Sequence, residues 1–174
     1  FLELLRSGLW GTPADLALFQ GNVDWKAILR IALEQTVQVI IADGIETLPE
    51  ESWPPKEALR KLMMVRIRTK QTHMLLNNVL NLIVNALNAE GIPSILLKGQ
   101  GVAQDYRIPE SRMCGDIDLY VGPENYERAC EIIAGLNHDG KEGEECEHHM
   151  HLQVGGVEVE MHRLAGTMPS TKLQ

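Results

Sequence analysis

Apolar residues recur every three or four positions over much of the first ninety residues, and this spacing predicts helices. We expect one helix over residues 24–43, with Asp24 or Asn22 as its cap. A proline-containing linker follows. A long helix is then predicted over residues 55–90, because its apolar positions form one broad stripe and Gly91 ends it. The front half of the chain is therefore predicted to be helical.

Beyond residue 91 the pattern changes to short apolar runs and to alternation of apolar and polar residues, which indicates strands. We expect a buried strand at 94–97, a short helix at 100–106, a strand at 116–121 and a helix at 124–136. The second half of the chain is thus predicted to mix helices and strands.

Two alternating segments, 148–154 and 157–162, flank Gly155-Gly156, which is typical of a tight hairpin turn. The apolar pairs across this turn are Val154 with Val157, Leu152 with Val159 and Met150 with Met161. The polar pairs are Gln153 with Glu158, His151 with Glu160 and His149 with His162. A slip of one residue would mix the two faces, so the pattern predicts this register.

Length and composition indicate a folded globular protein. A chain of 174 residues with a hydrophobic fraction of 44% fits one domain with a small helical appendage. It begins with Phe1, so we expect a fragment of a longer protein. No apolar stretch is long enough to span a bilayer and no signal-peptide pattern is present, so we expect no membrane partner. Three widely spaced cysteines, Cys114, Cys130 and Cys146, argue against a disulfide framework and predict a cytoplasmic location.

The net charge of −8 is unevenly distributed. Acidic residues concentrate over 116–160, whereas residues 56–70 are basic. Arg66, Lys70 and His73 follow one another at helical spacing and form a candidate surface for an RNA backbone; the alternative is an ordinary solvated helix face. Few aromatic residues are available to stack on bases, so small molecules and proteins are equally open as partners.

The candidate chemistry centres on Asp116 and Asp118, which are two residues apart in an apolar run. Alternation along a strand places both carboxylates on one face and Ile117 on the other. Paired carboxylates suit Mg²⁺, whose remaining ligands are often water and substrate phosphates. The alternative is a solvated Asp-x-Asp at the end of a strand.

The histidines of the predicted hairpin offer a second possibility. His149 and His151 share a face with Glu160 and His162, and imidazoles with a carboxylate are acceptable ligands for zinc or manganese. The alternative is a set of cross-strand pairs on a hydrated face.

Several motifs together resemble a known family. They are Leu97-Lys98-Gly99, Tyr106, Arg112, the run 115–119, and 159–164 with its Glu-x-His. Over residues 92–164 this combination is similar to the uncharacterised nucleotidyltransferase family of the DNA polymerase β-like superfamily. The resemblance implies an α+β fold in which a polymerase β-like core, a mixed sheet with flanking helices, follows a helical N-terminal segment. We therefore expect a helical region over 1–90 and a nucleotidyltransferase core, complete or truncated at its carboxy end, over 91–174.

The resemblance also implies a chemistry. Asp116, Asp118 and Glu160 match the family's metal-binding carboxylates, with Glu158 as the competing third carboxylate. They would hold Mg²⁺, or Mn²⁺, for a two-metal transfer of a nucleoside monophosphate from a nucleoside triphosphate (NTP). His162, together with His151 as an alternative, would transfer a proton or orient a carboxylate.

The triphosphate would contact Lys98, Gly99, Gln100 and Arg112. The turn Lys98-Gly99-Gln100-Gly101 departs from the Gly-Ser or Gly-Gly usual in the superfamily. Two other functions therefore stay open: a nucleotide-binding or regulatory module without turnover, and a transition-metal-binding protein. The acceptor, whether a small molecule, a protein or RNA, and the oligomeric state are not encoded in any motif.

Overall fold

The computed structural model describes residues 1–137, 144–145 and 149–165. The chain divides into two compact units, which are described separately. The helical unit comprises residues 1–73 and 102–114. The strand unit comprises 74–101 and the chain from 115 onward. This division does not test the predicted domain boundary near residue 90, which stays a prediction.

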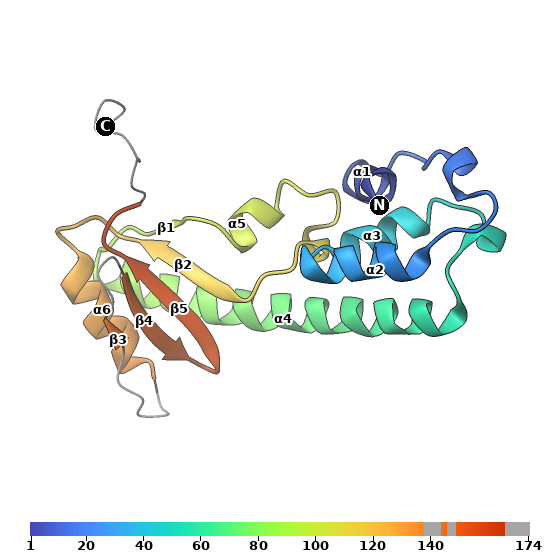
Figure 1. Cartoon of the computed structure of the whole chain (residues 1–174). Coiled ribbons are helices and arrows are strands. Elements are labelled where there is room, and N and C mark those ends of the chain that lie inside the picture. Colours follow the sequence, from blue (N-terminus) through green and yellow to red (C-terminus); the bar gives the residue numbers. More distant parts are fainter. Residues whose placement is uncertain (138–143, 146–148, 166–174) are drawn as a thin grey trace. The chain divides into compact units, whose positions relative to one another are not determined.

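Short helices and the first part of one long helix make up the helical unit (Figure 1). They are α1 (Leu2–Trp10), η1 (Leu16–Phe19), α2 (Trp25–Glu34), α3 (Gln38–Ile45), η2 (Glu50–Ser52), α4 (Lys56–Ala89) and η3 (Pro109–Ser111). The predicted long helix is confirmed as α4. The single helix predicted over 24–43 is wrong, because the chain breaks between α2 and α3 where Thr36 has a φ of 56°. Asp24 does cap α2, accepting a hydrogen bond from the Ala27 amide.

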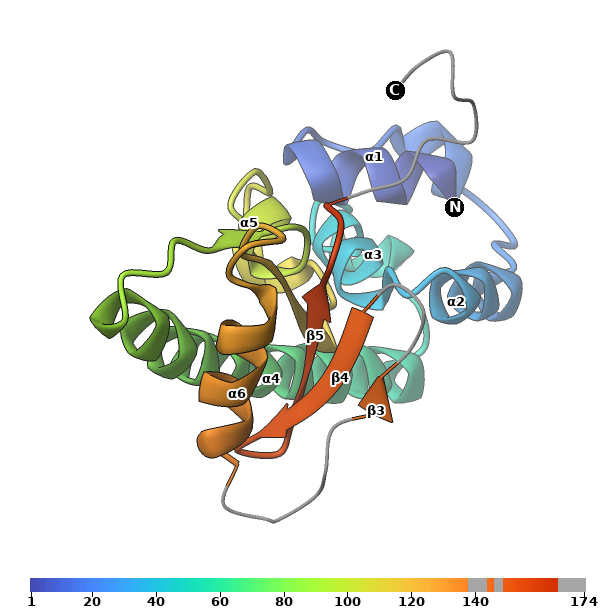
Figure 2. The same ribbon diagram turned by 90° about the vertical axis from the view of Figure 1, so that its left-hand side faces the viewer.

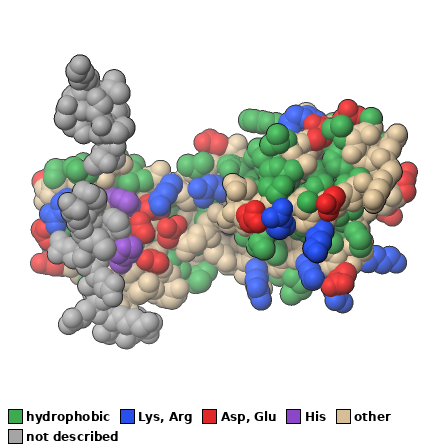
Figure 3. Space-filling model, in the orientation of Figure 1, with side chains coloured by type: hydrophobic (Ala, Val, Ile, Leu, Met, Phe, Trp, Pro, Cys, Tyr) green, Lys and Arg blue, Asp and Glu red, His purple; other side chains and the backbone are tan. Residues whose placement is uncertain are grey.

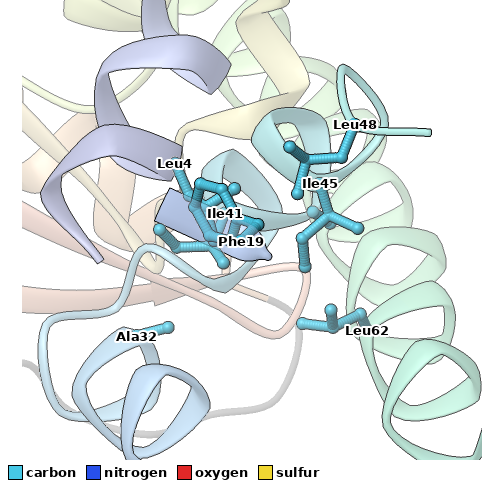
Figure 4. Close-up of a cluster of buried hydrophobic side chains, with 8 residues drawn as sticks. Leu4, Phe19, Ala32, Ile41, Ile45, Leu48 and Leu62 are labelled. Carbon is cyan, nitrogen blue, oxygen red and sulfur yellow. The ribbon is translucent and has the colours of Figure 1, made fainter. Parts of the chain in front are cut away.

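A buried apolar cluster holds the helical unit together (Figure 4). It contains Leu4, Phe19, Ala32, Ile41, Ala42, Ile45, Leu48 and Leu62. Helices α1 and α3 approach closely because each presents a glycine at the contact. A Cβ added at Gly8 would lie 1.9 Å from the carbonyl oxygen of Ile40, and one at Gly44 would lie 2.1 Å from that of Leu4. Only glycine fits at these two positions.

Of the candidate RNA-binding residues Arg66, Lys70 and His73 on α4, two have partners within the helical unit. Arg66 forms ion pairs with Asp43, at 2.6 Å, and with Glu46. His73 is buried, and its Nε2 lies 2.6 Å from the carbonyl oxygen of Arg112. Arg66 and His73 therefore connect α4 to other segments of the helical unit. The sequence pattern did not show this, because their partners are distant in sequence.

The strand unit contains a five-stranded mixed sheet. Its elements after α4 are β1 (Ile95–Leu96), α5 (Gln100–Ala103), β2 (Asp116–Tyr120), α6 (Tyr126–Gly135), β3 (Glu144–Glu145), β4 (His149–Val154) and β5 (Val157–His162). The strand order is β1-β2-β5-β4-β3, with β2 parallel to β5 and the other neighbours antiparallel. Figure 2 shows β5, β4 and β3 side by side, and α6 contacts β4 and β5. The predicted α+β class with flanking helices is confirmed.

Local details differ from the prediction. The strand expected at 94–97 is reduced to β1, and Ile95 is 59% exposed because β1 is an edge strand paired only with β2. The helix expected over 100–106 ends at Ala103. Helix α6 begins at Tyr126, two residues later than expected, with Asn125 at its N-cap position.

The hairpin register is confirmed at all six predicted pairs, from Val154 with Val157 to His149 with His162. Gly155 and Gly156 have φ values of 56° and 79°, as a tight turn with two left-handed residues requires. Val159 and Met161 are completely buried on the apolar face. This face anchors the sheet in its core and leaves the opposite face for polar side chains.

Two further predictions concern features that the structure covers in part. Within the described ranges, no helix is long and apolar enough to cross a membrane. Cys114 is partly buried and Cys130 is buried, whereas Cys146 lies outside the described residues, so the prediction that no disulfide framework is present stays a prediction.

Candidate active site

The parallel pair β2 and β5 brings four carboxylates onto one face of the sheet. Asp116 is in register with Glu158, and Asp118 with Glu160. Because side chains alternate along each strand, these four residues lie on the face opposite buried Ile117. Residues that are 42 positions apart in sequence thereby form one acidic surface.

Asp118 is the centre of this surface, and its side chain is completely buried. Its Oδ1 lies 2.9 Å from Nε2 of His162 and 3.0 Å from Nζ of Lys98. Its Oδ2 is buried with no hydrogen-bond partner among the described residues. Burial by itself raises the pKa of Asp118, but the hydrogen bonds from His162 and Lys98 outweigh it, so the pKa lies below its ordinary value. Asp118 is therefore an ionised carboxylate, and its Oδ2 is open in the sense that no described group satisfies it.

Lys98 reaches this carboxylate because of the backbone around it. The Leu97 amide donates to the carbonyl oxygen of Asp118 at 3.0 Å, which extends the pairing of β1 with β2 by one residue. Gly99 then turns the chain with a φ of 62°, a conformation that favours glycine. The Lys98 ammonium lies 3.0 Å from Asp118 and 3.9 Å from Asp116, and the hydrogen bond to Asp118 raises the pKa of Lys98.

Glu160 links two groups of potential ligands. Its carboxylate lies 3.4 Å from His162 on one side and 3.8 Å from His151 on the other. The first group is Asp118, Glu160 and His162, and the second is His151, Glu158 and Glu160. In each group the potential ligand atoms lie within 4.8 Å of one another. Glu160 is largely buried at 17% exposure, whereas Glu158 is 46% exposed.

The donor set fits a divalent cation. Carboxylate oxygens are the ligands that Mg²⁺ and Mn²⁺ prefer, and the buried Oδ2 of Asp118 supplies one that no group in the described part of the chain satisfies. A buried polar atom without a partner costs free energy, and coordination of a cation would remove that cost. The residues present are therefore suitable for a metal.

The other predicted site residues are placed less centrally. Asp116 belongs to neither ligand group and is partly exposed beside Lys98. Gln100 is buried. Arg112 belongs to the helical unit, where its guanidinium donates to Sγ of Cys114 at 2.8 Å. The side chain of His149 is not described. The structure thus brings together Asp118, Glu160, His162 and Lys98. Figure 3 shows histidine and acidic side chains side by side on the strand unit.

Two contacts were not predicted from the sequence. His151 lies 2.7 Å from Glu158, closer than the 3.8 Å to Glu160, its directly opposite neighbour. Diagonal cross-strand neighbours lie within reach of long side chains, so the sequence signal existed but did not select between the two glutamates. The second contact is the ion pair of Lys98 with Asp118, which depends on the antiparallel pairing of β1 with β2.

Carboxylates from two neighbouring parallel strands, gathered around a buried aspartate, are an arrangement that suits divalent cations. The chain belongs to the family described as uncharacterised nucleotidyltransferase, whose sequence model matches residues 21–170. The match includes most of the helical front half, so the resemblance first seen over 92–164 extends along the chain. No curated protein and no solved structure matches the sequence.

Proposed function

We propose that this nucleotidyltransferase moves a nucleoside monophosphate from an NTP to an acceptor, with divalent cations held by Asp116, Asp118 and Glu160. The observation that carries the proposal is the buried, ionised Asp118 with its open Oδ2, directly across from Glu160. Two bound cations would neutralise charge on the α-phosphate and on the departing pyrophosphate.

The protein residues have different tasks in this proposal. Asp118 is held in place by His162 and by burial, so its open oxygen has a fixed direction. Glu160 faces it from the neighbouring strand, and Asp116 lies at the more exposed end of the acidic surface. His162 acts as a positioning residue, because its Nε2 contacts Asp118 and lies near Glu160. A pre-oriented set of carboxylates lowers the entropy cost of positioning the cations and the substrate.

The triphosphate would lie beside the turn that begins at Lys98. The Lys98 side chain is half exposed, so its ammonium is accessible to an incoming phosphate. Gly99 permits close approach of a ligand to the backbone. Gln100 and Arg112 remain proposed contacts, Gln100 through its backbone because its side chain is buried. Helix α5 has only four residues, so we assign no phosphate binding to its dipole.

A second candidate function is a nucleotide-binding module without turnover. It is favoured by one observation: the Lys98 ammonium already lies on Asp118, in a position that a catalytic cation would share. A regulatory module predicts that an NTP binds but that no pyrophosphate is released.

Release of pyrophosphate separates these two functions. The protein would be incubated with each NTP, Mn²⁺ and panels of small-molecule, protein and RNA acceptors. We expect release that is abolished in Asp116→Asn/Asp118→Asn. Asp105→Asn, at an exposed aspartate of the helical unit, is the matched control and should retain activity. Binding without release from any NTP would support the regulatory module, and equal release by the double variant would refute the assigned site.

A further inference from the structure

Lys98 lies where its positive charge would oppose a cation bound by the two aspartates. Its ammonium is 3.0 Å from Oδ1 of Asp118 and 3.9 Å from Oδ2 of Asp116, so it lies against both carboxylates. Oδ1 of Asp118 also contacts His162, which leaves Oδ2 as its open atom. A divalent cation bound by both aspartates would therefore stand next to the Lys98 ammonium.

We propose that Lys98 competes with the metal for Asp118. The lysine leaves Asp118 only when a nucleotide supplies phosphate oxygens for its ammonium to bind. The inference rests on the proposed function of the site. It makes binding of cation and nucleotide interdependent: the cation alone binds weakly, because it must displace Lys98 into water, whereas the cation and triphosphate together bind strongly.

The structure of the side chain supports such an exchange. Lys98 is 51% exposed although its partner Asp118 is completely buried, so the lysine can withdraw without opening the core. Its ammonium is a compact charge on a flexible stem, which suits movement between two anionic partners. The backbone needs no rearrangement, because the Leu97–Asp118 hydrogen bond and the turn at Gly99 fix the origin of the side chain.

The negative charge of the site explains why a lysine that competes with cations would limit their binding in the absence of substrate. Four carboxylates lie on this face of the two strands, at positions 116, 118, 158 and 160. A surface of this kind would attract divalent cations whether or not a substrate is present. A lysine beside Asp118, the central carboxylate of this surface, lowers that attraction. The cation is therefore expected to bind together with the nucleotide.

The test compares Lys98→Met, which removes the charge, with Lys98→Arg, which keeps it. Binding of Mn²⁺ alone and of ATP in the presence of Mn²⁺ would be measured by calorimetry. Two charges this close at a partly hydrated site change affinity by about tenfold. We therefore expect Lys98→Met to bind Mn²⁺ about tenfold more tightly and ATP about tenfold more weakly, and Lys98→Arg to bind Mn²⁺ as the wild type does.

Changes of opposite sign distinguish competition from a structural role, because a variant that only damages the site would lose affinity for both ligands. Unchanged or weaker Mn²⁺ binding by Lys98→Met would overturn the inference. The proposed function would survive that result if wild-type Mn²⁺ binding is lost in Asp118→Asn. Absence of Mn²⁺ binding from the wild type and both Lys98 variants, with or without ATP, would overturn the proposed function and this inference with it.

Discussion

The choice of Glu160 over Glu158 as the third metal ligand leads to a quantitative prediction. Both residues lie on the same face of β5, two positions apart, so their carboxylates originate about 6.6 Å from each other. Glu158 is exposed and faces Asp116, whereas Glu160 is largely buried and faces Asp118. We expect Glu160→Gln to lower affinity for Mn²⁺ strongly and Glu158→Gln to lower it only slightly.

The magnitudes follow from the separation of each carboxylate from the ion. A ligand carboxylate about 2.1 Å from a divalent ion contributes ~4 kcal/mol even with the dielectric constant of water. The glutamine oxygen of Glu160→Gln would still coordinate the ion and restore part of this free energy. We therefore expect the affinity for Mn²⁺ to fall about 100-fold. Taking the strand spacing of about 6.6 Å as the distance from Glu158 to an ion on Glu160, the attraction in water is ~1.3 kcal/mol, and physiological salt reduces it to ~0.5 kcal/mol. For Glu158→Gln the loss is therefore about 2.5-fold.

Calorimetric titration with Mn²⁺ in the presence of ATP would measure both values, and circular dichroism would confirm that both variants fold. Equal losses for the two variants would show that the ion is held by long-range charge rather than by a specific ligand. A larger loss for Glu158→Gln would refute the assignment and move the ion toward the group of His151, Glu158 and Glu160.

Two further predictions concern stability. Gly44→Ala places a methyl group 2.1 Å from the backbone oxygen of Leu4, so urea denaturation should show a loss of about 2–3 kcal/mol in unfolding free energy. Gly135→Ala should show no loss, because no described atom beyond its chain neighbours and its own helix lies within 4 Å of the added carbon. Equal effects of the two changes would refute the close contact of α1 with α3. The hydrogen bond from Arg6 lowers the pKa of Glu3 from 4.5 to about 2. The contribution of Glu3 to the free energy of unfolding is therefore complete above pH 4.5 and lost toward pH 2. Glu3→Gln should flatten the profile of unfolding free energy against pH over this range. An unchanged profile would contradict the ion pair of Glu3 with Arg6.

Alternation was the sequence signal that predicted the site best. In the hairpin, each residue of 149–154 has a partner of its own kind in 157–162, so a single register satisfies both faces, and the structure has that register. The same alternation placed Asp116 and Asp118 on one face of β2. Parallel pairing of β2 with β5 was not readable from this pattern, because it depends on strands separated by α6 and the hairpin turn.

Features that depend on distant partners were predicted poorly. Helical spacing gave the boundaries of α4. It also made Arg66 and His73 candidates for a nucleic-acid surface or a solvated face, because their partners Asp43 and Arg112 come from other segments and could not be foreseen. The break at Thr36 was missed since apolar spacing continues across it. The contact of Lys98 with Asp118 depends on the edge pairing of β1, which involves only two residues.

The central claim is that Asp118 holds the cation that a nucleotide needs for binding. The most direct test is calorimetric titration of ATP with Mn²⁺ into wild-type protein, Asp118→Asn and the control Asp105→Asn, each repeated with the metal chelated. We expect metal-dependent binding by the wild type and the control, and a loss of at least about 100-fold for Asp118→Asn, whose amide keeps the size of the side chain but removes its charge. Equal, metal-independent binding of ATP by all three proteins would contradict the claim.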